Sequence, residues 1–205
     1  MKSFKKHFSK PDGILGMIAG RIMALENRKL NAWTVSLLGL KNHDHILEIG
    51  YGSGMCMEKI LKTHNNIKID GVDVSETMRK QASKRLEDKI ENKQVHLITG
   101  DIEEVDMPYQ AYDKIMTVNN YTIWDHPKKG LENVFGALKS NGKIAITMQP
   151  REENASSAKT RMFAKQIFND LTNCGFSNIK IHFKRIRPEL AVCVTAVKLK
   201  RLGHN

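Results

Sequence analysis

The chain has 205 residues, of which 40% are hydrophobic and 27% are charged. A chain of this length is most simply one domain, and it can bury about 70% of its unfolded surface without disulfides or metals to hold it together. Its three cysteines, Cys56, Cys174 and Cys193, are odd in number and far apart, with no Cys-x-x-Cys spacing. This pattern argues against a disulfide framework or a zinc site and favours a reducing cytoplasm.

The N-terminus shows no secretory signal, because it lacks an apolar stretch that ends in small residues. The longest apolar stretch, residues 14–25, is interrupted by Arg21. It is also shorter than the roughly 20 residues that span a bilayer. We therefore expect a soluble, cytoplasmic protein without a transmembrane segment.

The net charge of +11 is concentrated in the two ends of the sequence. Residues 1–45 carry 8 Lys and Arg against 3 Asp and Glu, and residues 151–205 carry 11 against 4. Residues 46–150 are nearly neutral, with 14 against 15. Basic ends either form a solvated surface or bind an anionic partner such as nucleic acid or a membrane surface, and the sequence leaves both open.

We expect two segments: residues 1–40 as a basic N-terminal segment with helices that precede the first strand, and residues 41–205 as one globular unit. Ile14, Ile18 and Ile22 recur at helical spacing within the first segment. Such helices either cover a bound ligand or pack on the sheet as additional core. A membrane-interface helix is a third option, which the scarcity of Lys and Arg in this stretch weakens.

The rest of the sequence is organised around residues 46–54, Ile-Leu-Glu-Ile-Gly-Tyr-Gly-Ser-Gly. An apolar run ends in Gly50, Gly52 and Gly54, and a helix-compatible run follows, which predicts a strand, a tight turn and a helix. Glycine suits a turn that adopts positive φ and lets a ligand lie against the main chain. The unpaired amide groups at the start of the helix point back at such a ligand.

A second strand, residues 67–73, ends in the carboxylate of Asp73. Parallel strands deliver their C-terminal ends to one edge of a sheet, where ligands bind. An acidic side chain at this position can accept hydrogen bonds from both hydroxyls of a ribose. The alternative is that Asp73 caps the following helix, but Ser75 can perform that role.

The arrangement of Glu48, Gly50, Gly52 and Gly54 resembles the acidic-x-Gly-x-Gly-x-Gly motif of the class I methyltransferases that use S-adenosylmethionine. A dinucleotide fingerprint would instead place its third glycine one residue later. The resemblance implies that this turn, together with Glu48 and Asp73, binds S-adenosylmethionine, and that no metal ion is needed.

Further donor-binding positions follow from the same resemblance. The third strand, residues 95–99, runs into Asp101 and Ile102. These two match the acidic residue that holds the adenine amino group and the apolar residue that lies against the ring. The other residues that the resemblance places in the donor pocket are Val74, Met78 and Asn119.

The fourth strand, residues 112–118, is followed by the polar and aromatic segment 119–127. This segment resembles the corresponding stretch of small-molecule methyltransferases, and it lacks the Asn/Asp-Pro-Pro-Tyr signature of many DNA and protein amide N-methyltransferases. If the acceptor must lose a proton, Tyr121 or His126 is placed to act as the base. The alternative for His126 is an ordinary loop residue next to Pro127.

The remaining sequence continues the alternation of helices and strands. Residues 128–138 predict a helix that stops at 139–142, where Gly142 supplies a left-handed cap, and residues 143–148 predict a fifth strand. Residues 160–174 predict a further helix, buried through Phe163, Ile167, Phe168 and Leu171.

Two final strands, residues 179–183 and 190–197, predict an antiparallel hairpin. Five strand and helix units followed by a hairpin predict an α/β protein with the Rossmann-like class I methyltransferase fold. The expected sheet has seven strands, most of them parallel, with helices on both faces.

The resemblance implies an enzyme that moves a methyl group from S-adenosylmethionine to a small-molecule acceptor by in-line displacement. Two alternatives remain open. One is an RNA methyltransferase whose basic ends hold phosphates, and the other is a non-catalytic protein that retains the donor pocket.

Overall fold

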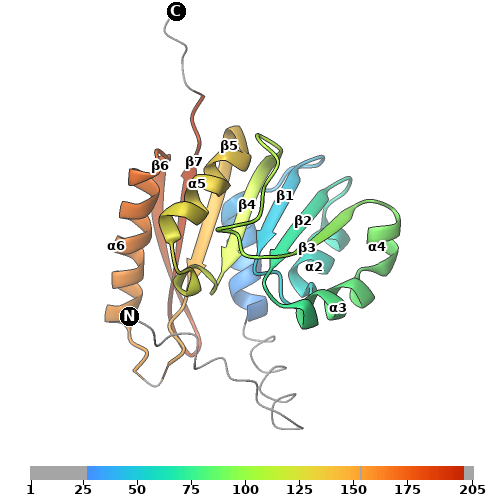
Figure 1. Cartoon of the computed structure of the whole chain (residues 1–205). Helices are drawn as coiled ribbons and strands as arrows, with labels where there is room; N and C mark the ends of the chain where they lie inside the picture. Colours follow the sequence, from blue (N-terminus) through green and yellow to red (C-terminus); the bar gives the residue numbers. More distant parts are fainter. Residues whose placement is uncertain (1–26, 153, 201–205) are drawn as a thin grey trace, which may run out of the picture.

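The computed structural model describes residues 27–152 and 154–200. Its strands are β1 His45–Ile49, β2 Lys68–Asp73, β3 Val95–Thr99, β4 Tyr112–Val118, β5 Leu138–Met148, β6 Ser177–Ile186 and β7 Glu189–Val197. They form one sheet in the order β3-β2-β1-β4-β5-β7-β6 (Figure 1). β1 to β5 pair in parallel, and β7 lies antiparallel between β5 and β6. The predicted sheet and its C-terminal hairpin are confirmed.

Helices cover both faces of this sheet (Figure 1). One helix is described over residues 27–38. The others are α2 Met55–Thr63, α3 Glu76–Arg85, α4 Glu87–Glu91, the short 3-10 helix η2 Tyr121–Ile123, α5 Pro127–Ala137 and α6 Ser157–Asn173. Two apolar clusters form the core: one contains buried residues of α5 and α6, and the other contains those of helix 27–38, α2 and α3. Because side chains alternate along a strand, Leu47 joins the first cluster and Ile46 the second.

The start of β5 differs from the prediction. The strand begins at Leu138, so residues 139–142 belong to it and are not a turn after the helix. The left-handed backbone conformation falls on Asn141, with φ 62°, and not on Gly142. A Cβ at Gly142 would lie 2.7 Å from Leu138 Cγ, so close packing explains this glycine.

Helix α6 confirms the predicted helix but presents a different face to the core. Phe168, expected in the buried stripe, is 38% exposed, and Phe163 is only partly buried. The buried residues of α6 are Thr160, Ala164, Ile167 and Leu171, whose spacing places them on one side of a helix. The predicted burial is therefore confirmed at Ile167 and Leu171, Phe163 packs against the core while only partly buried, and the prediction for Phe168 is wrong.

The N-terminal predictions can be examined only from residue 27 onward. Helix 27–38 packs on the sheet, with Leu30 fully buried and Leu38 only 1% exposed, which supports the alternative of additional core for this part. The expectations for residues 1–26 lie outside the described residues. Among the described helices, none has both the length and the apolar composition that crossing a bilayer requires.

Candidate functional site

The turn between β1 and α2 adopts the strained backbone that its glycines allow. Gly50, Gly52 and Gly54 have φ of 74°, 53° and 77°, and Gly54 directly precedes α2. A side chain in this left-handed region costs about 1–2 kcal/mol, so three such positions in five residues strongly select glycine. The positive φ predicted for this turn is confirmed.

The surroundings of the three glycines differ. A Cβ at Gly50 would lie 2.6 Å from Asn120 Nδ2, and one at Gly54 would lie 2.9 Å from Leu86 Cδ1. A Cβ at Gly52 would meet no described atom within 4 Å. The protein itself therefore needs two of these glycines for close packing, whereas Gly52 leaves the main chain open on one side to a ligand.

Asp73 lies at the end of β2, beside this turn. Its Oδ2 accepts a hydrogen bond of 2.8 Å from the Gly52 amide, and its Oδ1 accepts one of 2.9 Å from the Ser75 amide. Each carboxylate oxygen has a second lone pair, and the side chain is partly exposed, so a ligand hydroxyl can still reach it. The cap of α3 is Ser75, whose hydroxyl accepts from the Met78 amide, as predicted.

Glu48 lies on β1 on the same face as Ile46, which packs in the cluster that includes α2. Its side chain is only 5% exposed, and its Oε2 has no hydrogen-bond partner among the described residues. Burial raises the pKa of Glu48 to about 8; a hydrogen bond with the Cys56 thiol opposes this rise, and the charge of Asp73 adds to it. A buried carboxyl oxygen without a partner beside an open turn suits a cationic ligand group, because the positive charge of the ligand would favour the ionised carboxylate.

The predicted adenine-binding residues are placed as follows. Asp101 is partly exposed after β3, and its Oδ1 accepts a hydrogen bond of 3.0 Å from the Glu103 amide. Ile102 is 3% exposed and packs in the cluster that contains α5. Val74 follows Asp73 and is 63% exposed, while Met78 is partly buried on α3.

The residues after β4 are held by hydrogen bonds from several elements. Asn119 Oδ1 accepts from the Gln149 amide at 2.8 Å, and its Nδ2 donates to Asn27 Oδ1 at 3.3 Å. Asn120 Oδ1 accepts from Trp124 Nε1 at 2.7 Å, which fixes the side chain that lies over Gly50. Asn119 therefore joins β5 and helix 27–38 next to the glycine turn.

The two predicted bases occupy different environments. Tyr121 is fully buried, and its hydroxyl donates to Asp170 Oδ2 on α6 at 2.8 Å. Burial, followed by this bond to Asp170, raises the pKa of Tyr121 well above its ordinary value. His126 is exposed, and its amide donates to Glu103 Oε1 at the start of α5. Both catalytic roles stay predictions, and the buried hydroxyl makes Tyr121 the weaker candidate.

Several residues near the site were not found from the sequence. Arg151 Nη2 donates to Asn27 Oδ1 at 3.0 Å, so Asn27 bridges Arg151 and Asn119. Arg85 Nε donates to the Ser53 carbonyl at 2.8 Å and supports the glycine turn from α3. No motif marks these residues, because each acts through a partner that is distant in the sequence.

Comparison with known proteins identifies the family. Residues 46–142 match the family described as "Methyltransferase domain". The uncharacterized methyltransferase YdaC of Bacillus subtilis (strain 168) is 50% identical over 182 residues, which cover 89% of this chain and 98% of that protein. This chain belongs to the class I S-adenosylmethionine-dependent methyltransferases. The methyltransferase is thus an enzyme that uses S-adenosylmethionine, and the unpaired Glu48 oxygen and the open side of Gly52 fit this cationic donor.

More distant relatives share the fold. Malonyl-[acyl-carrier protein] O-methyltransferase 1 of Ilyobacter polytropus is 32% identical over 109 residues, which cover 53% of this chain and 39% of that protein. The structure of Haemonchus contortus phosphoethanolamine N-methyltransferase 2, bound to S-adenosylhomocysteine, superposes with a TM-score of 0.69 at 17% identity. The match covers 84% of this chain and 53% of that one.

Within residues 27–152 and 154–200, no group of three His, Cys, Asp or Glu side chains is arranged to hold a metal ion.

Proposed function

We propose that this methyltransferase transfers a methyl group to a small-molecule acceptor that binds where β4 and β5 end. The polar cluster of Asn27, Asn119 and Arg151 is the observation that carries this proposal. It lies next to the glycine turn through Asn120, whose side chain packs over Gly50. A guanidinium in such a position favours an acceptor with an anionic group, because it binds carboxylates and phosphates in two-pronged geometry.

In this proposal the glycine turn and Glu48 receive the methionine part of the donor. Asp73 accepts hydrogen bonds from the ribose hydroxyls. The adenine lies among Val74, Met78, Asp101 and Ile102, with the amino group on Asp101. Asn119 contacts the donor near its methyl group, where the acceptor approaches.

The chemical step requires orientation more than acid–base chemistry. The sulfonium of the donor loses its charge as the methyl group moves, so the enzyme must hold sulfur, methyl carbon and acceptor in line. Such positioning is worth up to about 7–11 kcal/mol. An acceptor that is a protonated amine or a hydroxyl would also need a base, and His126 is the better placed of the two candidates because it is exposed.

The distribution of charge supports a small acceptor over RNA. The Lys and Arg residues of the C-terminal part include Arg161 and Lys165 on α6 and Lys180 and Lys184 on β6. β6 is separated from β1 by three strands, so these cations are remote from the glycine turn. The name of one structural neighbour, a phosphoethanolamine N-methyltransferase, also agrees with a small anionic acceptor. The proposal keeps a cytoplasmic location, which suits three cysteines without disulfide bonds.

The test is donor turnover with a panel of carboxylates, phosphate esters and amines. S-adenosylhomocysteine is quantified, and mass spectrometry identifies the methylated product. We expect turnover of an anionic compound, and Arg151→Gln should raise its KM about tenfold, the loss expected for a charged hydrogen bond. Arg161→Gln, a matched change on α6, should leave KM unchanged.

Two outcomes would contradict the proposal. Methylation of total RNA that falls steeply with added salt would favour the RNA alternative. Donor binding without turnover of any acceptor would favour the non-catalytic alternative.

A further inference from the structure

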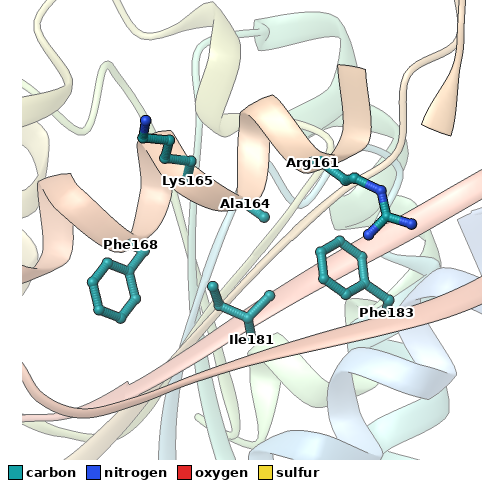
Figure 2. Close-up of a pocket in the computed structure, with 6 residues that line it drawn as sticks. All are labelled: Arg161, Ala164, Lys165, Phe168, Ile181 and Phe183. Carbon is teal, nitrogen blue, oxygen red and sulfur yellow. The ribbon is translucent and has the colours of Figure 1, made fainter. Parts of the chain in front are cut away.

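A shallow groove of about 350 Å³ runs between α6 and β6 (Figure 2). Three strands separate β6 from β1, which leads into the glycine turn. Its floor is apolar, with Phe168, Ile181 and Phe183 exposed by 38%, 40% and 42%. Arg161 and Lys165 of α6 also line it, and the Arg161 guanidinium lies 5.4 Å from the Phe183 ring. Large exposed apolar side chains that share one groove indicate a contact surface more than a solvated one.

The same groove borders an edge of the sheet. β6 is the last strand in the order and pairs only with β7 within the part of the chain that the structure describes. Its outer row of backbone amides and carbonyls faces away from the sheet. Such an edge is a template for another strand unless the protein blocks it.

Apolar and basic side chains alternate along the middle of β6. Ile181 and Phe183 are paired with Val194 and Val192 of β7, which belong to the cluster that contains α6. The residues between and beside them, Lys180, His182 and Lys184, therefore point to the opposite face. Lys184 Nζ lies 6.0 Å from the ring of Trp33 on helix 27–38, which confirms this direction. Over residues 180–184, β6 thus has an apolar row on one face and a cationic row on the other.

We propose that this edge binds an extended segment of a partner protein in which apolar and acidic residues alternate. The segment adds a strand to β6, which satisfies the outer backbone groups by β-augmentation. Its apolar residues lie in the groove against Ile181 and Phe183. Its carboxylates face Lys180 and Lys184 on the other side. This binding goes beyond the methylation reaction and does not depend on which acceptor is used.

The charges and the shape of this surface favour an acidic and apolar segment over a second copy of the chain or an anionic membrane. In a second copy paired antiparallel with His182 opposite His182, Lys180 of one chain would face Lys184 of the other, and like charges opposite each other destabilise a pair of strands. Lysine on an edge strand is a known means of preventing such self-association. An anionic membrane would meet the cations, but it would leave the backbone edge without partners and would not fill a concave groove.

The test uses the full chain and two labelled synthetic peptides. In one, Val and Glu alternate over eight residues; in the other, four Val precede four Glu. Fluorescence anisotropy should show the alternating peptide binding at least about tenfold more tightly than the block peptide. Backbone amide resonances of β6 should shift on binding, and those of the glycine turn should not.

Variants of exposed side chains sharpen the test. Phe183→Thr should weaken binding of the alternating peptide about tenfold, and Lys180→Glu with Lys184→Glu should abolish it. The doubly substituted protein should instead bind a peptide in which Val and Lys alternate, which a misfolded variant would not do. Donor binding measured by calorimetry should be unchanged in both variants.

Four results would overturn the proposal. The first is equal binding of the alternating and block peptides. The second is failure of the protein with Lys180→Glu and Lys184→Glu to bind the peptide in which Val and Lys alternate. The third is sedimentation that shows a dimer of the peptide-free protein, lost in Phe183→Thr. Binding to phosphatidylglycerol vesicles without binding of the alternating peptide would assign the surface to a membrane and would also overturn it.

Discussion

Carboxylates near the two ends of the parallel strands have opposite surroundings. At the edge where the strands begin, Asp70 Oδ2 accepts from Tyr112 at 2.8 Å and lies 3.1 Å from His45 Nε2. At the edge where the strands end, Glu48 Oε2 is buried with no partner among the described residues. The acceptor oxygen of Asp70 is therefore fully used within the protein, whereas an oxygen of Glu48 is still able to accept a hydrogen bond from a ligand. This difference shows that a carboxylate surrounded by donors is already satisfied by the protein, whereas one with an unpaired oxygen can still bind a ligand.

The pKa values of these two carboxyl groups are shifted in opposite directions. Burial raises the pKa of Asp70, but hydrogen bonds from His45 and Tyr112 outweigh it, so this pKa lies below its ordinary value. The stability that this group contributes is present above the unfolded pKa of about 4 and is lost as pH falls through the folded value. Burial raises the pKa of Glu48 to about 8, so the folded state holds a proton that the unfolded state releases. Its contribution is therefore largest in acid and is lost as pH rises toward 8.

The largest expected effect is at Gly50. Gly50→Ala should lower the free energy of unfolding by about 2–5 kcal/mol, because left-handed strain is added to a clash with Asn120. Gly52→Ala, which meets no described atom within 4 Å, should lose only about 1–2 kcal/mol. Urea unfolding of both variants measures the difference. Equal losses would show that the packing distinction between these glycines is wrong.

The next effect concerns the donor rather than the fold. Asp73→Ala should weaken S-adenosylhomocysteine binding by about 2 kcal/mol or more, the usual loss for a charged hydrogen-bonding partner. Asp70→Ala, three residues earlier on the same strand and hydrogen-bonded to Tyr112, should leave the affinity unchanged. Isothermal calorimetry checks both. An unchanged affinity in Asp73→Ala would mean that the ribose lies elsewhere.

The same Asp70→Ala variant tests the network of Asp70, Tyr112 and His45. It leaves the Tyr112 hydroxyl and His45 without their shared acceptor, so we expect a loss of about 1–3 kcal/mol in unfolding free energy. Tyr112→Phe removes a single donor and should lose about 0.5–1.5 kcal/mol. Both losses should shrink as the pH is lowered toward protonation of Asp70. A loss that is independent of pH would contradict the network.

The last effect is a pH dependence of stability that arises from Glu48. Glu48→Gln has no proton to release, so its stability relative to the natural chain should increase from pH 5 to pH 8. The increase should not exceed about 1.4 kcal/mol per pH unit. Thermal unfolding across this range measures it. A constant difference would show that Glu48 titrates normally in the folded protein.

Local patterns predicted much of the fold correctly. β3 and β4 have the predicted bounds, since each is a short apolar run between turn signals. The glycine turn was also predicted, because the need for positive φ is a property of single residues. The prediction for α6 placed Phe168 in the core, where Ala164 lies instead, because spacing alone cannot say which side of a helix meets the sheet.

The sequence by itself determined the order of the strands along the chain, the conformation of residues 50–54 and the family. These follow from interactions between residues that are near one another along the chain. Only the tertiary structure decided that Asn120 covers Gly50, that Glu48 has an oxygen without a partner, and that Asp70 meets Tyr112 from a distance of 42 residues. Those contacts depend on strand register and helix packing, which join segments that no local pattern connects.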